Sequence, residues 1–104
     1  MATTSKTAIP LTEKQFMAMV IELAKLCDWR HFHVHDARRS PSGWPDLALL
    51  RPPDLLFVET KTDRGRLTPA QRTWLEALAR CPNVEVYTWR PGDWPAIVER
   101  LKMR

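Results

Sequence analysis

Residues 43–71 of the chain read GWPDLALLRPPDLLFVETKTDRGRLTPAQ, in which charged residues bracket two apolar runs. The runs Leu47–Leu50 and Leu55–Val58 have the length and composition of buried strands. Asp46 stands just before the first run. Glu59 and Lys61 end the second run, two residues apart and therefore on one face of the strand. Burying such charges costs free energy unless they are paired or bind a metal. A small chain that places three of them at the ends of its core strands is expected to use them.

The length and composition of the chain indicate one soluble domain. Its 104 residues are enough for a single core and leave no room for a second. We expect residues 1–10 to be a flexible lead-in and residues 11–104 to form the domain. The net charge of +4 is compatible with a polyanionic partner, and equally with a surface that is merely soluble. No apolar run approaches the ~20 residues of a membrane span, and no secretory signal precedes the domain, so we expect a cytoplasmic protein.

The two cysteines argue against a zinc or redox motif. Cys27 and Cys81 each stand at the end of an expected helix, and the chain has no C-x-x-C pair. We expect both thiols to be reduced and to be buried or half-buried.

A first helix is predicted to begin near Leu11, because Thr12 and Gln15 have the spacing of a capping box. Its buried stripe at helical spacing is Phe16, Val20, Leu23 and Cys27. Glu13 lies at the edge of that stripe, whereas Glu22 points almost oppositely and is expected to be solvated.

The segment Trp29–His35 is predicted to be a strand with His31, His33 and His35 on one face. Three alternating histidines are spread along ~13 Å of backbone, too far for all of them to meet one metal ion. We therefore expect a partly exposed edge strand or a strand that faces DNA. The following loop, residues 36–45, carries the paired Arg38 and Arg39, which either clamp phosphates or are simply solvated.

The rest of the chain alternates strands and helices. We predict strands at Asp46–Leu50 and Leu55–Lys61 with a turn at Arg51–Asp54, then a helix capped by Thr68 with Pro69 in first position. A strand at Val84–Trp89 and a last helix, turned and capped by Pro91–Asp93, complete the domain. Three consecutive strands form a meander, and the crossover through the second helix brings the fourth strand in parallel. The fold class is therefore α/β, a mixed sheet with helices on its faces, in the order α-β-β-β-α-β plus a C-terminal helix.

The charged positions allow two interpretations. Carboxylates delivered by Asp46 and Glu59 from adjacent strands can converge on Mg²⁺ or Mn²⁺, with the Thr60 backbone carbonyl as a further ligand. Lys61 would then act on an attacking water or on a charged transition state. Alternatively, Glu59 and Lys61 form an ion pair of little energetic value and Asp46 is a strand-start turn residue. Residue types alone leave both readings open.

Several motifs in order resemble a known nuclease group. They are Gly43-x-Pro45-Asp46, Glu59-x-Lys61, Leu67-Thr68-Pro69-Ala70-Gln71 and the ending Trp89-Arg90-Pro91-Gly92-Asp93-Trp94. This set resembles the PD-(D/E)xK nuclease superfamily and, within it, the VRR-NUC family (virus-type replication–repair nucleases), especially its small stand-alone phage members. The resemblance spans roughly residues 12–101 and implies a restriction-endonuclease-like core.

Carried over by position, the resemblance makes Asp46 and Glu59 metal ligands and Lys61 the catalytic lysine. Gln71 becomes the glutamine that supports the site, a role compatible with its alternative as a helix cap. Glu13 is the choice for the glutamate of the first helix. The alternative for Glu13 is a first-turn residue favoured only by the helix dipole.

The resemblance further implies a function and a partner. The expected protein is a Mg²⁺- or Mn²⁺-dependent DNA endonuclease, without an organic cofactor, that cuts Holliday junctions or other branched DNA in phage replication, recombination or repair. A phage-encoded protein of this kind acts in the bacterial cytoplasm as a homodimer. Arg64 and Arg66, together with Arg38 and Arg39, would hold the DNA backbone. The alternatives are a non-catalytic DNA-binding module on the same fold and a small interaction protein whose charges are surface pairs.

Overall fold

A four-stranded mixed sheet organises the molecule. The structure, a computed structural model, describes residues 11–34 and 41–104. Strands β1 (Arg30–His33), β2 (Leu47–Arg51), β3 (Asp54–Thr60) and β4 (Glu85–Trp89) lie in the order β1-β2-β3-β4. The first three are antiparallel neighbours, and β4 joins β3 in parallel, as the sequence predicts for a meander followed by a helical crossover. The expected lead-in, His35, Arg38 and Arg39 lie outside the described residues.

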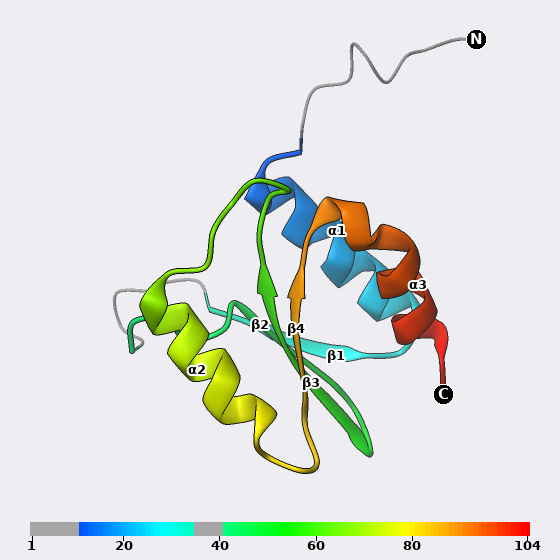
Figure 1. The fold of residues 1–104 in the computed structure, drawn as a ribbon. Coiled ribbons are helices and arrows are strands. Elements are labelled where there is room, and N and C mark those ends of the chain that lie inside the picture. The colour runs from blue at the N-terminus through cyan, green and yellow to red at the C-terminus, as the bar shows by residue number, and fades with distance from the viewer. Residues whose placement is uncertain (1–10, 35–40) are drawn as a thin grey trace, which may run out of the picture.

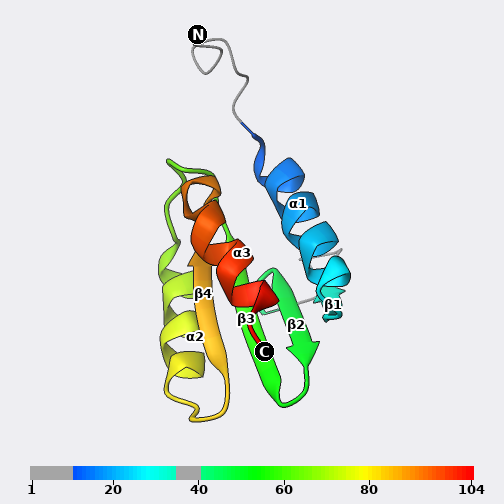
Figure 2. The same ribbon diagram turned by 90° about the vertical axis from the view of Figure 1, so that its right-hand side faces the viewer.

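Within residues 11–34 and 41–104, three α-helices cover the two faces of this sheet. Helices α1 (Glu13–Leu26) and α3 (Trp94–Lys102) lie side by side on one face, and α2 (Pro69–Ala79) lies on the other (Figures 1 and 2). Both predicted capping boxes are present, with Thr12 and Thr68 as the N-caps. Among the described residues, no helix has the length and apolar character needed to span a membrane.

One expectation about capping is confirmed and one about burial is wrong. Residues Pro91–Asp93 form the expected turn, a 3-10 helix (η3), and Asp93 is the N-cap residue of α3, while its carboxylate accepts from the Arg90 backbone N–H at 2.9 Å. Cys27 is half-buried as expected, but Cys81 is exposed, because it follows the C-cap of α2.

The core lies between the sheet and the α1–α3 layer. Alternation along the strands sends Leu47 and Leu49 of β2, and Leu56 and Val58 of β3, to this side. The buried cluster on this face is completed by Phe16, Val20, Ala24, Trp29, Trp89, Ile97 and Leu101. The predicted stripe of α1 is thus shifted, because α3 packs beside α1 and buries Ala24 where Leu23 and Cys27 are only half-buried.

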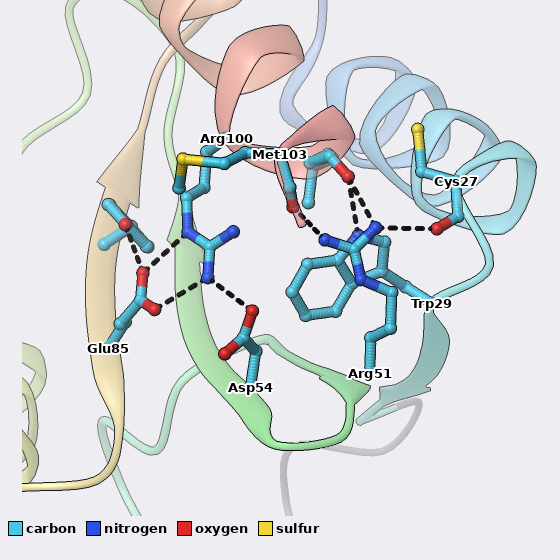
Figure 3. A network of polar contacts seen from close by, with 9 residues as sticks. Cys27, Trp29, Arg51, Asp54, Glu85, Arg100 and Met103 are labelled. Carbon is cyan, nitrogen blue, oxygen red and sulfur yellow. Dashed lines mark hydrogen bonds and ion pairs between the residues drawn. The ribbon is translucent and has the colours of Figure 1, made fainter.

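Arg51 ties the C-terminal ends of α1 and α3 to the sheet (Figure 3). The sequence predicts a turn residue, but Arg51 ends β2 and is only 8% exposed. Its guanidinium donates to the carbonyl of Cys27 at 2.9 Å, to that of Leu101 at 3.0 Å, and to that of Met103. It also stacks on Trp29, 4.2 Å from the ring centre. Carbonyls at helix ends lack intrahelical donors, and a cation there also opposes the helix dipole.

A second arginine joins α3 to the hairpin and to β4. Arg100 donates to Glu85 at 2.7 and 2.8 Å and to Asp54 at 3.1 Å (Figure 3). These bonds lower the pKa of Glu85. Arg51 and Arg100 therefore connect the C-terminal end of α3 to strands β2, β3 and β4.

Replacing Arg51 is expected to destabilise the fold. Arg51→Met keeps an apolar stem but leaves three carbonyls at helix ends without this donor, for an expected loss of about 2–4 kcal/mol in the free energy of unfolding. Urea denaturation would measure it. Arg72→Met, at an exposed position of α2, is the matched control. Equal stability of the two variants would contradict the role given to Arg51.

Candidate active site

Three carboxylates from three elements meet at one end of the sheet. Glu13 is the first residue of α1, Asp46 directly precedes β2, and Glu59 is the penultimate residue of β3. One carboxylate oxygen of each lies within 4.8 Å of the others. Since Leu47 pairs with Val58, continuing the antiparallel register places Asp46 opposite Glu59. Glu22, by contrast, is exposed and pairs with Lys25 at 3.5 Å.

Glu59 is the most enclosed of these carboxylates, with a side chain only 1% exposed. Its Oε2 accepts a hydrogen bond from Gln71 Nε2 at 2.9 Å and lies 4.0 Å from Lys61 Nζ. Its Oε1 is buried and has no hydrogen-bond partner within the described part of the chain. A buried charged oxygen without a donor is costly, which points to an electropositive group that belongs there.

Two of these carboxylates, Glu59 and Glu13, have a raised pKa. Burial, and then the charge of Asp46, raise the pKa of Glu59 to about 8. The same two causes, in the same order, raise the pKa of Glu13, while Lys61 acts in the opposite direction on both groups. One ammonium is therefore too little positive charge for three carboxylates this close together.

Gln71 links the start of α2 to Glu59. Its Oε1 accepts from the Thr68 N–H at 2.9 Å, and its own N–H donates to Thr68 Oγ1 at 3.1 Å, so the residue completes the capping box. Its Nε2 remains available and donates to Glu59. The two alternatives considered for Gln71, helix cap and support of the carboxylate, are thus both present as contacts.

Gly43 lets the segment before Asp46 lie against the first turn of α2. Its φ of +88° belongs to the left-handed region that favours glycine. A Cβ at this position would come within 2.4 Å of the Ala70 carbonyl carbon and 2.7 Å of the Gln71 nitrogen. Two motifs that are far apart in the sequence therefore touch through a residue that has no side chain.

Asp46 is oriented by the end of β3. Its Oδ2 accepts from the backbone N–H and from the hydroxyl of Thr60, both at 3.2 Å. The next N–H, that of Lys61, points the other way and donates to Trp89 at 3.0 Å. Because the C=O and N–H of a planar trans peptide point in opposite directions, the Thr60 carbonyl faces the Asp46 side.

The loop after Lys61 carries the exposed Arg64 and Arg66. Arg90, which the sequence did not single out for a role, holds this loop by donating to the carbonyls of Thr62 at 2.7 Å and Gly65 at 2.6 Å. These contacts join residues that are 28 and 25 positions apart in the chain, so no local sequence pattern predicts them. Of the expected histidine row, His31 is exposed and His33 half-buried, and the metal-capable group found in the described residues includes neither.

A family model for the VRR-NUC domain matches residues 10–90. The chain belongs to the VRR-NUC family. This assignment agrees with the motifs quoted above. A search among curated proteins gave no match.

The VRR-NUC fold seen here is also that of a solved resolvase structure. Hjc, a Holliday junction resolvase from the hyperthermophilic archaeon Archaeoglobus fulgidus, superposes with a TM-score of 0.51 at 21% sequence identity. The match covers 72% of this chain and 64% of the resolvase, so the chain spans less than two thirds of that protein's length. At this identity the similarity establishes the fold, α/β with a mixed sheet flanked by helices.

The residues at the cluster fit a hard divalent cation. Mg²⁺, Mn²⁺ and Ca²⁺ prefer carboxylate and carbonyl oxygens, the donor set that Glu13, Asp46 and Glu59 provide. The unpartnered Glu59 Oε1 and the raised pKa values of Glu59 and Glu13 both indicate missing positive charge at the same place.

Gly43→Ala is expected to destabilise the VRR-NUC domain by about 1–3 kcal/mol, because it combines a strained φ with a clash against backbone. Thermal unfolding followed by circular dichroism would measure the loss. Gly92→Ala is the control, since a Cβ there meets only Asp63 Oδ1, at 3.4 Å. Similar melting temperatures for the two variants would show that α2 can move away from Gly43.

Glu59 should make the stability of the metal-free protein depend on pH. Between its ordinary pKa and about 8, the folded chain holds a proton that the unfolded chain has released. The contribution of Glu59 to the free energy of unfolding is therefore fully present below about pH 4.5, and it is lost as the pH rises through 8. Glu59→Gln should gain on the order of 1–3 kcal/mol over the parent at pH 8.5 in EDTA, and nothing near pH 4.5.

The matched control for this pH dependence is Glu22→Gln, which removes an exposed carboxylate from α1. Melting temperatures of parent and variants across pH 4.5–8.5 decide the matter. A Glu59→Gln protein that is no more stable than the parent at high pH would mean that Glu59 ionises without penalty.

Proposed function

We propose that this protein is a divalent-metal-dependent DNA endonuclease that hydrolyses phosphodiester bonds in branched DNA. The observation that carries the proposal is the convergence of Glu13, Asp46 and Glu59, with Lys61 beside them, in a VRR-NUC domain. The described residues supply oxygen ligands, a nearby ammonium and exposed arginines, which are the groups that metal-assisted phosphodiester hydrolysis uses.

The ion would be held by Asp46, Glu59 and the Thr60 carbonyl, with Glu13 as a further ligand. Mg²⁺ or Mn²⁺ bound there would supply an activated water and stabilise charge on the leaving oxygen. The Thr60 N–H and hydroxyl fix one oxygen of Asp46 and leave the other for the ion. Gln71 holds Glu59 in a similar way, because it binds Oε2 while Oε1 has no hydrogen-bond partner in the described residues.

Lys61 is the proposed catalytic lysine. Its side chain is only 12% exposed and its ammonium lies 4.0 Å from Glu59, so the group is held at the cluster and does not extend freely into solvent. An ammonium in that position donates to a phosphate oxygen or to the attacking water, and it offsets the negative charge that grows in the transition state. The surrounding protein excludes part of the water, which strengthens that interaction.

The DNA backbone would be held by Arg64 and Arg66, on the loop that Arg90 supports beside Lys61. We assign Arg38 and Arg39, outside the described residues, to the same task. The similar fold of the Holliday junction resolvase supports branched DNA as the proposed substrate. A homodimer would match the two-fold symmetry of a junction. We place this activity in phage replication, recombination or repair, in the cytoplasm, and assign the nuclease domain to residues 11–104.

Loss of Asp46 or Lys61 should abolish cleavage without unfolding the protein. We expect Asp46→Ala and Lys61→Ala to lower the cleavage rate by at least about 100-fold, because each removes a charge that acts in the transition state. The measurement is a panel of Holliday junctions, flaps, single strands and plain duplex with Mg²⁺ and then Mn²⁺. EDTA should stop the reaction, and added metal should restore it.

The exposed residues Glu76 and Lys25 provide controls of the same charge, as Glu76→Ala and Lys25→Ala. Both should cleave at the parental rate. Full activity of Asp46→Ala or Lys61→Ala would rule out the assigned site. Salt-dependent DNA binding with no cleavage of any substrate, with either metal, would instead identify a non-catalytic DNA-binding module.

A further inference from the structure

A groove leads away from the carboxylates along the outer side of α1. It begins at Glu13 and Asp46, and it continues between α1 and the end of β1, where His33 forms part of the wall. Its volume of about 650 Å³ lies in the range of pockets that enclose small organic ligands. The cluster and the groove are therefore one continuous surface, with the proposed reacting phosphate at its head.

The α1 side of the groove is a stripe beside the one that faces the core, and its apolar members Met17 and Ile21 also border the core. Lys14, Met17, Ala18 and Ile21 follow the spacing i, i+3, i+4, i+7 and all line the groove. Met17 is buried and Ile21 half-buried, which gives an apolar floor, while Ala18 and Lys14 are exposed at the side. Seven residues of helix make this stripe about 10 Å long.

Those dimensions and that chemistry suit a single nucleotide and exclude a duplex. The wall offers apolar surface and the ring of His33 for the flat face of a base, since histidine is among the side chains on which unpaired bases stack. Lys14 adds a cation for a neighbouring phosphate. Small Ala18 keeps the groove open where a longer side chain would fill it. Paired bases stay inside a stacked helix far wider than the groove and cannot enter it.

We propose that this groove binds an unpaired nucleotide next to the phosphate held at the carboxylates. The preferred substrate is then DNA with an unpaired base beside the scissile bond, as in a flap, a gap or an opened junction, and continuous duplex is a poor substrate. This inference rests on the proposed function, because it takes the carboxylate cluster as the place of the scissile phosphate.

The test fills the groove at Ala18. Ala18→Gln adds bulk without charge, and Ala18→Glu adds the same bulk with a negative charge. Ala96→Gln and Ala96→Glu, at an exposed position of α3, are the matched controls. The probe is a flapped duplex that carries 2-aminopurine, a fluorescent adenine analogue, as its first unpaired base. Binding is followed by its emission in Ca²⁺, and cleavage of flapped and plain duplex is compared in Mg²⁺.

We expect the parent and both Ala96 variants to change the probe's emission on binding and to cleave flapped DNA in preference to duplex. Both Ala18 variants should bind the flapped probe about tenfold more weakly, with duplex affinity of Ala18→Gln unchanged, because the unpaired base would no longer stack in the groove. An Ala18→Gln protein that still prefers flapped DNA over duplex as the parent does would overturn the proposal. Weaker binding of the flapped probe by Ala18→Glu alone would also overturn it, because charge repulsion would then explain the loss.

The binding and cleavage measurements separate this inference from the proposed function. Cleavage of flapped and plain duplex at equal rates, with no response from the probe, would reject the groove and leave the nuclease intact. A probe response that Ala18→Gln abolishes, in a protein that cleaves nothing, would support the groove and reject the nuclease.

Discussion

The carboxylate of Glu59 is almost completely removed from water, and the neighbouring elements are arranged around that constraint. A buried carboxylate needs donors or cations, and β3 brings its own in Lys61 while α2 contributes Gln71. Gln71 reaches Glu59 because α2 starts close to the sheet, and α2 starts there because Gly43 has no side chain to hold it away. The remaining oxygen has no hydrogen-bond partner in the described residues, and Asp46 and Glu13 add negative charge nearby, which favours a bound cation at the cluster.

The parts of this fold that depend on local interactions could be predicted from the sequence. Each capping box is made within four residues, so Thr12 and Thr68 predict where the two helices begin. Helical periodicity was enough to choose Glu13 over Glu22 as the α1 glutamate that lies at the site. Arg51 was misread because its partners lie 24 to 52 residues away and only the fold brings them together. The support that Arg90 gives the loop and the groove beside α1 were missed for the same reason.

The two ends of β2 serve different purposes. Asp46 precedes the strand and joins the carboxylates, whereas Arg51 ends it and holds the C-termini of α1 and α3 (Figure 3). Glu13 stands at the opposite end of α1 from Cys27, the residue whose carbonyl Arg51 binds. Helix α1 is therefore fixed at one end by a guanidinium, while its other end brings a carboxylate to the site. The stabilising guanidinium of Arg51 and the carboxylates of the cluster therefore lie at opposite ends of β2 and of α1.

Glu13, Asp46 and Glu59 are separated by 33 and 13 positions in the sequence, so no single helix, strand or loop contains the whole cluster. A chain whose first helix has detached keeps Asp46 and Glu59 but lacks Glu13, and one whose second helix is unformed leaves Glu59 without Gln71. Partly folded forms, such as those that emerge during synthesis or persist after damage, would then be inert toward DNA. Under the proposed function, distributing the cluster in this way makes cutting depend on the completed fold.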